Sequence, residues 1–180
     1  MKKYITILFV FTITVSFAQK KTYNIGILID KKSEEILPLL AKLKSEIRVV
    51  VGESVIVNFP EESLLVNDFN LQKAAENYTQ LINDNTDIIL AFGVVNNAIV
   101  DKLQEHKKPT ILFGAVNKDL IDIDFNKVTS GIKNFTYLIE SESYEEDIKK
   151  LHELTKFRRL GIVVEQHFLD ILPLKNTFDK

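Results

Sequence analysis

Polar residues and glycines that could contact a ligand stand at the ends of apolar segments. Asp30 follows the apolar run at residues 23–29, and Gly93 follows the run at residues 88–92. The second run has no polar alternation, which is typical of a parallel strand covered on both faces. The carboxylate of Asp30 could bind an amine, or it could pair with Lys31 or form the turn. We expect a ligand here, because ligands of open α/β sheets bind outside the carboxyl ends of the strands.

The segment after the central run has the residues of a strand-to-helix turn. Gly93 allows a turn that a side chain would obstruct, and Asn96 and Asn97 are predicted to cap the helix that follows. Either asparagine could also contact a ligand. This helix is expected to end at Lys108, because the next residue, Pro109, cannot continue it.

Patterns typical of catalytic or metal sites are missing from the sequence. There is no cysteine, and the three histidines lie on separate predicted elements without metal-like spacing. No Gly-x-Gly-x-x-Gly follows the first strand, and there is neither a Gly-Lys-Ser/Thr nor a Gly-x-Ser-x-Gly motif. The acidic residues between 140 and 147 surround a predicted helix start, where they complement the helix dipole. We therefore expect a protein that is not an enzyme and that uses neither a metal nor a cofactor.

Strands and helices are predicted to alternate along the chain. Strands are predicted at residues 23–29, 54–59, 88–92, 110–113 and 160–164, with helices at 33–51, 70–82, 96–108 and 143–154. Residues 61–69 and 114–127 are predicted to be loops. Strands joined by helices of this length pair in parallel through right-handed crossovers. The predicted fold class is therefore α/β, with a doubly wound parallel sheet.

The domain organisation follows from both ends of the sequence. Residues 1–18 have the basic start, the short apolar run and the Ser16-Phe17-Ala18 end of a secretory signal peptide. Residues 19–131 are predicted to form one α/β lobe. The extended run 132–139 is interpreted as leaving that sheet, so that residues 132–180 contain a hinge crossing and the incomplete start of a second lobe. We predict a soluble periplasmic protein with no membrane anchor once the signal is removed.

Net charge excludes some partners. The formal net charge is −2 with acidic and basic residues interspersed. This balance gives no electrostatic reason to expect binding to nucleic acid or to an anionic membrane surface.

Several short segments together resemble a family of transport proteins. They are KPTILFGAV at 108–116, Asp119, Gly131, NFT at 134–136 and, after a predicted helix, RLGIVV at 159–164. Their order is similar to that in the solute-binding proteins of ABC transporters with the type I periplasmic-binding-protein fold, and more narrowly in the family usually labelled uncharacterised ABC transport substrate-binding components. The resemblance extends from Tyr23 to about Gln166.

The resemblance implies a function and a set of site residues. Two α/β lobes joined by a hinge near residues 130–139 would hold a small polar or amino-acid-like solute without converting it and deliver it to a membrane permease. An alternative is a ligand-sensing or accessory envelope domain of the same fold with no transport role. Family members commonly have a hydroxyl residue where this chain has Val94 and a proline where it has Leu120. The implied site residues are Asp30, Lys31, Gly93, Val94, Asn96, Gly114, Ala115, Asn117, Asn134 and Thr136.

Overall fold

The computed structural model describes residues 20–100, 103, 105–114, 127–138, 144–164 and 166–171. The predicted signal peptide, residues 1–18, lies outside the described residues. No helix in the described part of the chain is both long enough and apolar enough to cross a bilayer.

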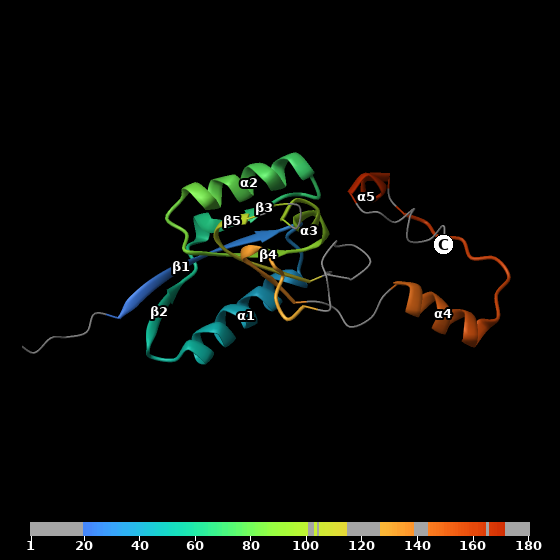
Figure 1. Ribbon diagram of the computed structural model, residues 1–180, viewed down its shortest axis with the longest axis horizontal. Coiled ribbons are helices and arrows are strands. Elements are labelled where there is room, and N and C mark those ends of the chain that lie inside the picture. The colour runs from blue at the N-terminus through green and yellow to red at the C-terminus, as the bar shows by residue number, and fades with distance from the viewer. Residues whose placement is uncertain are drawn as a thin grey trace, which may run out of the picture.

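A parallel sheet forms the centre of the molecule (Figure 1). Its strands follow the order β2-β1-β4-β5-β6, and β3 also pairs with β1. Every pair of strands is parallel. The α/β prediction with a parallel sheet is therefore confirmed. The strand bounds are β1 (Lys21–Ile29), β2 (Val55–Asn58), β3 (Leu64–Val66), β4 (Ile88–Phe92), β5 (Glu105–Phe113) and β6 (Lys133–Tyr137).

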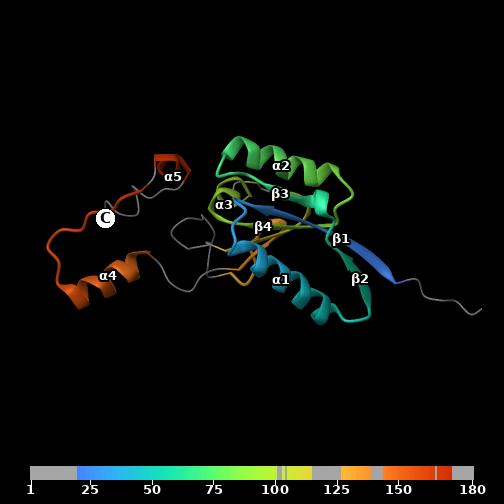
Figure 2. The ribbon, with the colours of Figure 1, turned by 180° about the vertical axis from the view of Figure 1, so that it is seen from behind.

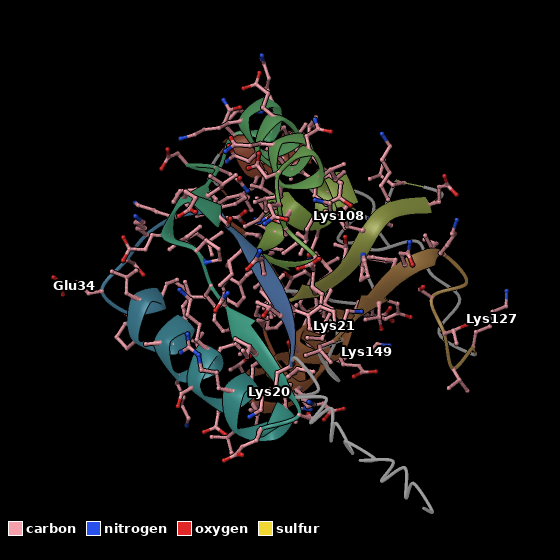
Figure 3. The ribbon with its side chains drawn as sticks, turned by 90° about the vertical axis from the view of Figure 1, so that its left-hand side faces the viewer. Lys20, Lys21, Glu34, Lys108, Lys127 and Lys149 are labelled. Carbon is pink, nitrogen blue, oxygen red and sulfur yellow. The ribbon has the colours of Figure 1, made fainter. Side chains whose placement is uncertain are left out.

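Helices cover the two faces of the sheet. Helix α1 (Ile36–Val51) lies on one face, whereas α2 (Leu71–Asn83) and α3 (Val94–Val100) lie on the other. Figure 3 views the molecule from the left-hand side of Figure 1 and shows α1 and α2 on opposite sides of the strands. Strand β1 contributes to both cores, because Leu28 packs with α2 while Ile27 and Ile29 pack with α1. The continuous apolar run of β1 is thus explained by burial on both faces.

The predicted helix start at Asn70 is confirmed for α2, whereas α1 begins at Ile36, three residues after the predicted start at Ser33. The backbone N–H of Ile36 donates to Ser33 Oγ at 3.2 Å, and that of Lys73 donates to Asn70 Oδ1 at 2.9 Å. Each side chain accepts from a backbone group that has no partner within its helix. Helix α1 ends at Val51, as predicted, and Gly52 follows it with a positive φ of 58°.

The segment predicted to be a surface link contains a strand instead. A 3₁₀ turn, Glu61–Ser63, leads directly into β3, which pairs with Ile27, Leu28 and Ile29 of β1. Strand β2 pairs with the amino-terminal half of β1 from the same side. The prediction was wrong because a strand of three residues is too short to show a period of its own in a polar segment.

The helix predicted to reach Lys108 ends earlier. Helix α3 stops at Val100, and β5 already begins at Glu105. Lys108 therefore lies on a strand (Figure 3). Its Nζ donates to the carbonyl oxygens of Leu81 and Asp84 at the end of α2. A lysine does bind the carboxyl end of a helix, as its charge favours, but the helix is a different one.

Strand β6 corrects the predicted path of the chain. Residues 132–139 were interpreted as leaving the first sheet, but Lys133–Tyr137 pairs in parallel with β5 in that same sheet. The sheet therefore continues past residue 131. An edge strand and a crossing strand have the same local pattern, so only its pairing distinguishes them.

The described residues beyond β6 include two helices, α4 (Tyr144–Thr155) and the shorter α5 (Gln166–Ile171). The strand predicted at residues 160–164 is not formed: this segment has no regular secondary structure, and Val163 is fully exposed. A strand needs a neighbour to accept its hydrogen bonds, and the described residues supply none at this place. That the residues after β6 begin a second lobe stays a prediction.

Candidate functional site

The candidate site is the carboxyl edge of the sheet between β1 and β4. Strand order reverses here, because β2 and β3 lie on one side of β1 and β4 lies on the other. Such a switch point leaves a crevice outside the strand ends in open α/β sheets. Asp30 directly follows β1 and Gly93 directly follows β4 at this place, as the sequence predicts.

Asp30 is buried at this edge and is surrounded by hydrogen-bond donors. Only 6% of the residue is exposed. Its Oδ2 accepts from the backbone N–H of Val95 at 3.0 Å, and its Oδ1 accepts from Asn67 Nδ2 at 3.2 Å and Asn96 Nδ2 at 3.3 Å. Both carboxylate oxygens are therefore used by the protein itself. This favours the structural interpretation of Asp30 over direct binding of an amine.

Burial raises the pKa of Asp30 above its ordinary value. Removing the carboxylate from water disfavours its charged form, and this effect outweighs the others. The donors from Val95 and Asn67 act in the opposite direction, because they stabilise the carboxylate. The hydrogen bonds from Val95 and Asn67 thus offset part, but not all, of the effect of burial on the pKa of Asp30.

Asn96 and Asn97 do not cap the helix, contrary to prediction. Both are buried residues inside α3, which begins at Val94. The acceptor at the start of this helix is Asp30, through its bond from Val95. Asn96 instead bridges the strand and the carboxylate, since its Nδ2 also donates to the carbonyl of Phe92 at 2.8 Å. The sequence could not show this, because the capping residue lies more than sixty positions away.

Gly93 is required by its surroundings. Its φ is 112°, a conformation that side chains disfavour, and an added Cβ would overlap the carboxylate of Asp30. Gly114, at the end of β5, has a φ of 66°, and a Cβ there would overlap the ring of Phe92. Both glycines therefore allow the strand ends to pack closely, and a geometric role is sufficient for each.

Asn67 is a member of the site that the sequence reading missed. It follows β3, is fully buried, and donates from Nδ2 to Asn96 Oδ1 at 2.9 Å as well as to Asp30. Asn77 of α2 donates to Asn67 Oδ1 at 3.1 Å and so fixes the orientation of its amide. The available signal was an asparagine directly after the apolar triplet at residues 64–66, at the end of an unrecognised strand.

The remaining predicted residues are distributed over several places. Lys31 is exposed beside Asp30, and Val94 is half-buried at the start of α3. Asn134 lies at the opposite edge, where its Nδ2 donates to the carbonyl of His106 at 2.9 Å. It lines, together with Thr136, a separate depression of about 660 Å³ beside β5. Ala115 and Asn117 lie outside the described residues.

The structure therefore brings part of the predicted site together. Asp30, Gly93 and Asn96 are in direct contact, whereas Asn134 is at the far end of the strands. Among the described residues, no three acidic or histidine side chains are grouped as they would be around a metal ion. What the described residues show at this edge is a network of hydrogen bonds around Asp30 and the close packing of Gly93 against its carboxylate.

Comparisons with protein-family models, with curated proteins and with solved structures each give no match to this chain. The fold itself places the protein among the Rossmann-like α/β proteins, with a mostly parallel central sheet and helices on both faces.

Proposed function

We propose that this protein is the extracytoplasmic solute-binding component of an ABC transporter, which holds a small polar or amino-acid-like solute without converting it. The observation that supports this most is the convergence of three turns, after β1, β3 and β4, at the switch point of the sheet. Helix α5 reaches the same edge, since the ring of Phe168 contacts that of Phe69. A solute bound there would lie between two parts of the chain and would be passed on to a membrane permease.

Within this proposal the buried cluster shapes the site, and exposed groups contact the solute. Asp30, Asn67 and Asn96 hold the strand ends in place. Lys31 offers an exposed ammonium group next to them, which suits the carboxylate of an amino-acid-like solute. Val94 presents an apolar surface at the start of α3.

Thermal unfolding with candidate solutes tests the proposal. The mature chain is screened against amino acids, short peptides and sugars; a solute at 100 times its Kd adds about 2.7 kcal/mol of stability. Val94→Trp should remove the shift by filling the edge. Val50→Trp is the matched control, because Val50 is exposed near the carboxyl end of α1, at the opposite edge of the sheet. A panel without any shift, or a shift that survives Val94→Trp unchanged, would refute solute binding at this edge.

One observation favours a second candidate function. The polar side chains at the switch point satisfy one another, as they would in a domain that keeps the fold as an accessory envelope protein without transport. A protein that unfolds cooperatively but gives no shift with any solute supports this candidate.

A further inference from the structure

The turn between β3 and α2 has an uncommon backbone conformation. Asp68 and Phe69 have φ values of 53° and 56°, which is the left-handed region, and neither residue is glycine. Such a conformation is unfavourable for a bulky side chain and persists only where the surrounding structure imposes it.

Bonds on both sides of the turn impose this conformation. The backbone N–H of Phe69 donates to the carbonyl of Asp30 at 3.2 Å, and that of Asn67 donates to the carbonyl of Ile29 at 2.9 Å. Lys73, on the first turn of α2, forms an ion pair with Asp68. The turn is thus fixed to the same strand end that holds the buried cluster. Because the turn is fixed in this way, the ring of Phe69 has a defined position.

The ring of Phe69 meets a helix from a distant part of the chain. Its centroid lies 5.5 Å from that of Phe168, with the ring planes at 78°, which is a favourable edge-to-face geometry. Phe168 belongs to α5, a helix of six residues. A helix this short is not stable alone in water, so its position depends on contacts with the rest of the protein. Figures 1 and 2 show α5 near the ends of α2 and α3, away from α4.

We propose that Phe69 and Phe168 form a latch that holds residues 166–171 over the carboxyl edge of the sheet, and that the latch opens when a solute enters. The opening step rests on the proposed solute-binding function. The ring contact itself does not, and it is measured without any solute.

Fluorescence of a single introduced tryptophan measures the latch. The sequence contains no tryptophan, so Phe168→Trp supplies the only indole. Quenching by acrylamide is compared in this protein alone and combined with Phe69→Ala or Phe69→Gly. Phe69→Gly removes the ring and also relieves the left-handed conformation, so a folded sample is expected. The control is Phe59→Ala, which removes a ring that packs beneath Lys44 and Arg48.

We expect the quenching constant to rise at least two-fold with either change at Phe69, with an emission shift to longer wavelength, and to stay the same with Phe59→Ala. Equal quenching in all four proteins would show that α5 does not rest on Phe69 and would overturn the latch. Circular dichroism verifies that each variant is folded.

A solute from the thermal screen then tests the opening step. Quenching of the indole should increase as that solute is added. If the solute stabilises the protein without changing the quenching, the opening step is refuted while solute binding stands. If no solute stabilises the protein, the proposed function fails, and the quenching in the absence of solute still decides whether the ring contact exists.

Discussion

The carboxylate of Asp30 organises the strand ends at the candidate site. It accepts hydrogen bonds from an asparagine after β3, from an asparagine in α3 and from the backbone at the start of that helix. One side chain thereby joins three loops that are distant in sequence. A replacement such as Asp30→Ala would remove the acceptor of the Val95 N–H and one of the two acceptors of each asparagine amide, at a cost of roughly 1–3 kcal/mol for a buried group left unsatisfied. Loss of a ligand response in that variant would therefore not separate binding from folding.

Gly93 allows a sharper test of this packing. Gly93→Ala should lower the free energy of unfolding by roughly 2–4 kcal/mol, because φ is 112° and the added methyl group would overlap the Asp30 carboxylate. Chemical denaturation measures the loss. The matched control is Gly161→Ala, since a Cβ at Gly161 meets nothing within 4 Å and its φ lies outside the positive region that side chains disfavour. Comparable stability of the two variants would contradict the close approach of β4 to Asp30.

The buried side chain of His106 should make the stability of the protein depend on pH. Burial lowers its pKa, and the carbonyl of Val100 partly offsets that effect. Its ring stacks on Phe135 and is hydrogen-bonded to the hydroxyl of Tyr78. Because the pKa is lower in the folded state than in the unfolded state, the unfolded state takes up the proton first as the pH falls below about 6.5. Neutral His106 therefore contributes its full stability above about pH 6.5, and this contribution is lost as the pH falls from there to the lowered pKa of the folded state.

Denaturation at a series of pH values checks this sign. His106→Phe keeps the aromatic stacking but cannot be protonated, so its stability should decline less in the same range. His152→Gln is the control, because His152 is exposed on α4. An unchanged pH profile in His106→Phe would show that His106 is not the titrating group.

At the scale of elements, local pattern was sufficient for some predictions and insufficient for others. The apolar run of β4 and the amphipathic pattern of α2 were predicted correctly, since burial on two faces or on one stripe leaves a periodic signal. β3 was missed because three residues carry no period. The partners of β6 and of Asp30 were not predictable, because pairing and hydrogen bonding between distant segments depend on the assembled fold.

Helix α2 supports a prediction at this scale. Asn70→Ala should lower the free energy of unfolding by about 1 kcal/mol, because it removes the acceptor for the backbone N–H of Lys73. Asn83→Ala, at the exposed carboxyl end of the same helix, should change it by less than about 0.5 kcal/mol. Thermal or urea denaturation compares the two. A larger loss at Asn83 would mean that the start of α2 is not stabilised by this cap.

The whole molecule has two regions with different degrees of burial. The sheet and its three helices bury two apolar clusters. In the described residues beyond β6 several apolar side chains are largely in solvent, with Leu154 84% exposed and Val163 fully exposed. Exposed apolar surface of this kind is typical of segments that contact something else.

Limited proteolysis measures this difference. Trypsin should first cleave at Lys156, Arg158 or Arg159, which are exposed in a segment without regular structure. Sites within α1, such as Lys44 and Arg48, should be cut later, because a helix must open locally before a protease can bind it. Mass spectrometry of the early fragments identifies the order. Early fragments that end within α1 would contradict the conclusion that the residues beyond β6 are less protected than the sheet and its helices.

Two short strands, β2 and β3, occupy one flank of β1, and this affects how the sheet can associate with other chains. Strands β2 and β3 are short, and Pro60 and a 3₁₀ turn separate them. A foreign strand would find no continuous row of backbone donors and acceptors on that flank, so accidental growth of the sheet into aggregates is discouraged there. Among the described strands, β6 forms the opposite flank. Lateral addition of a further strand is therefore directed to β6.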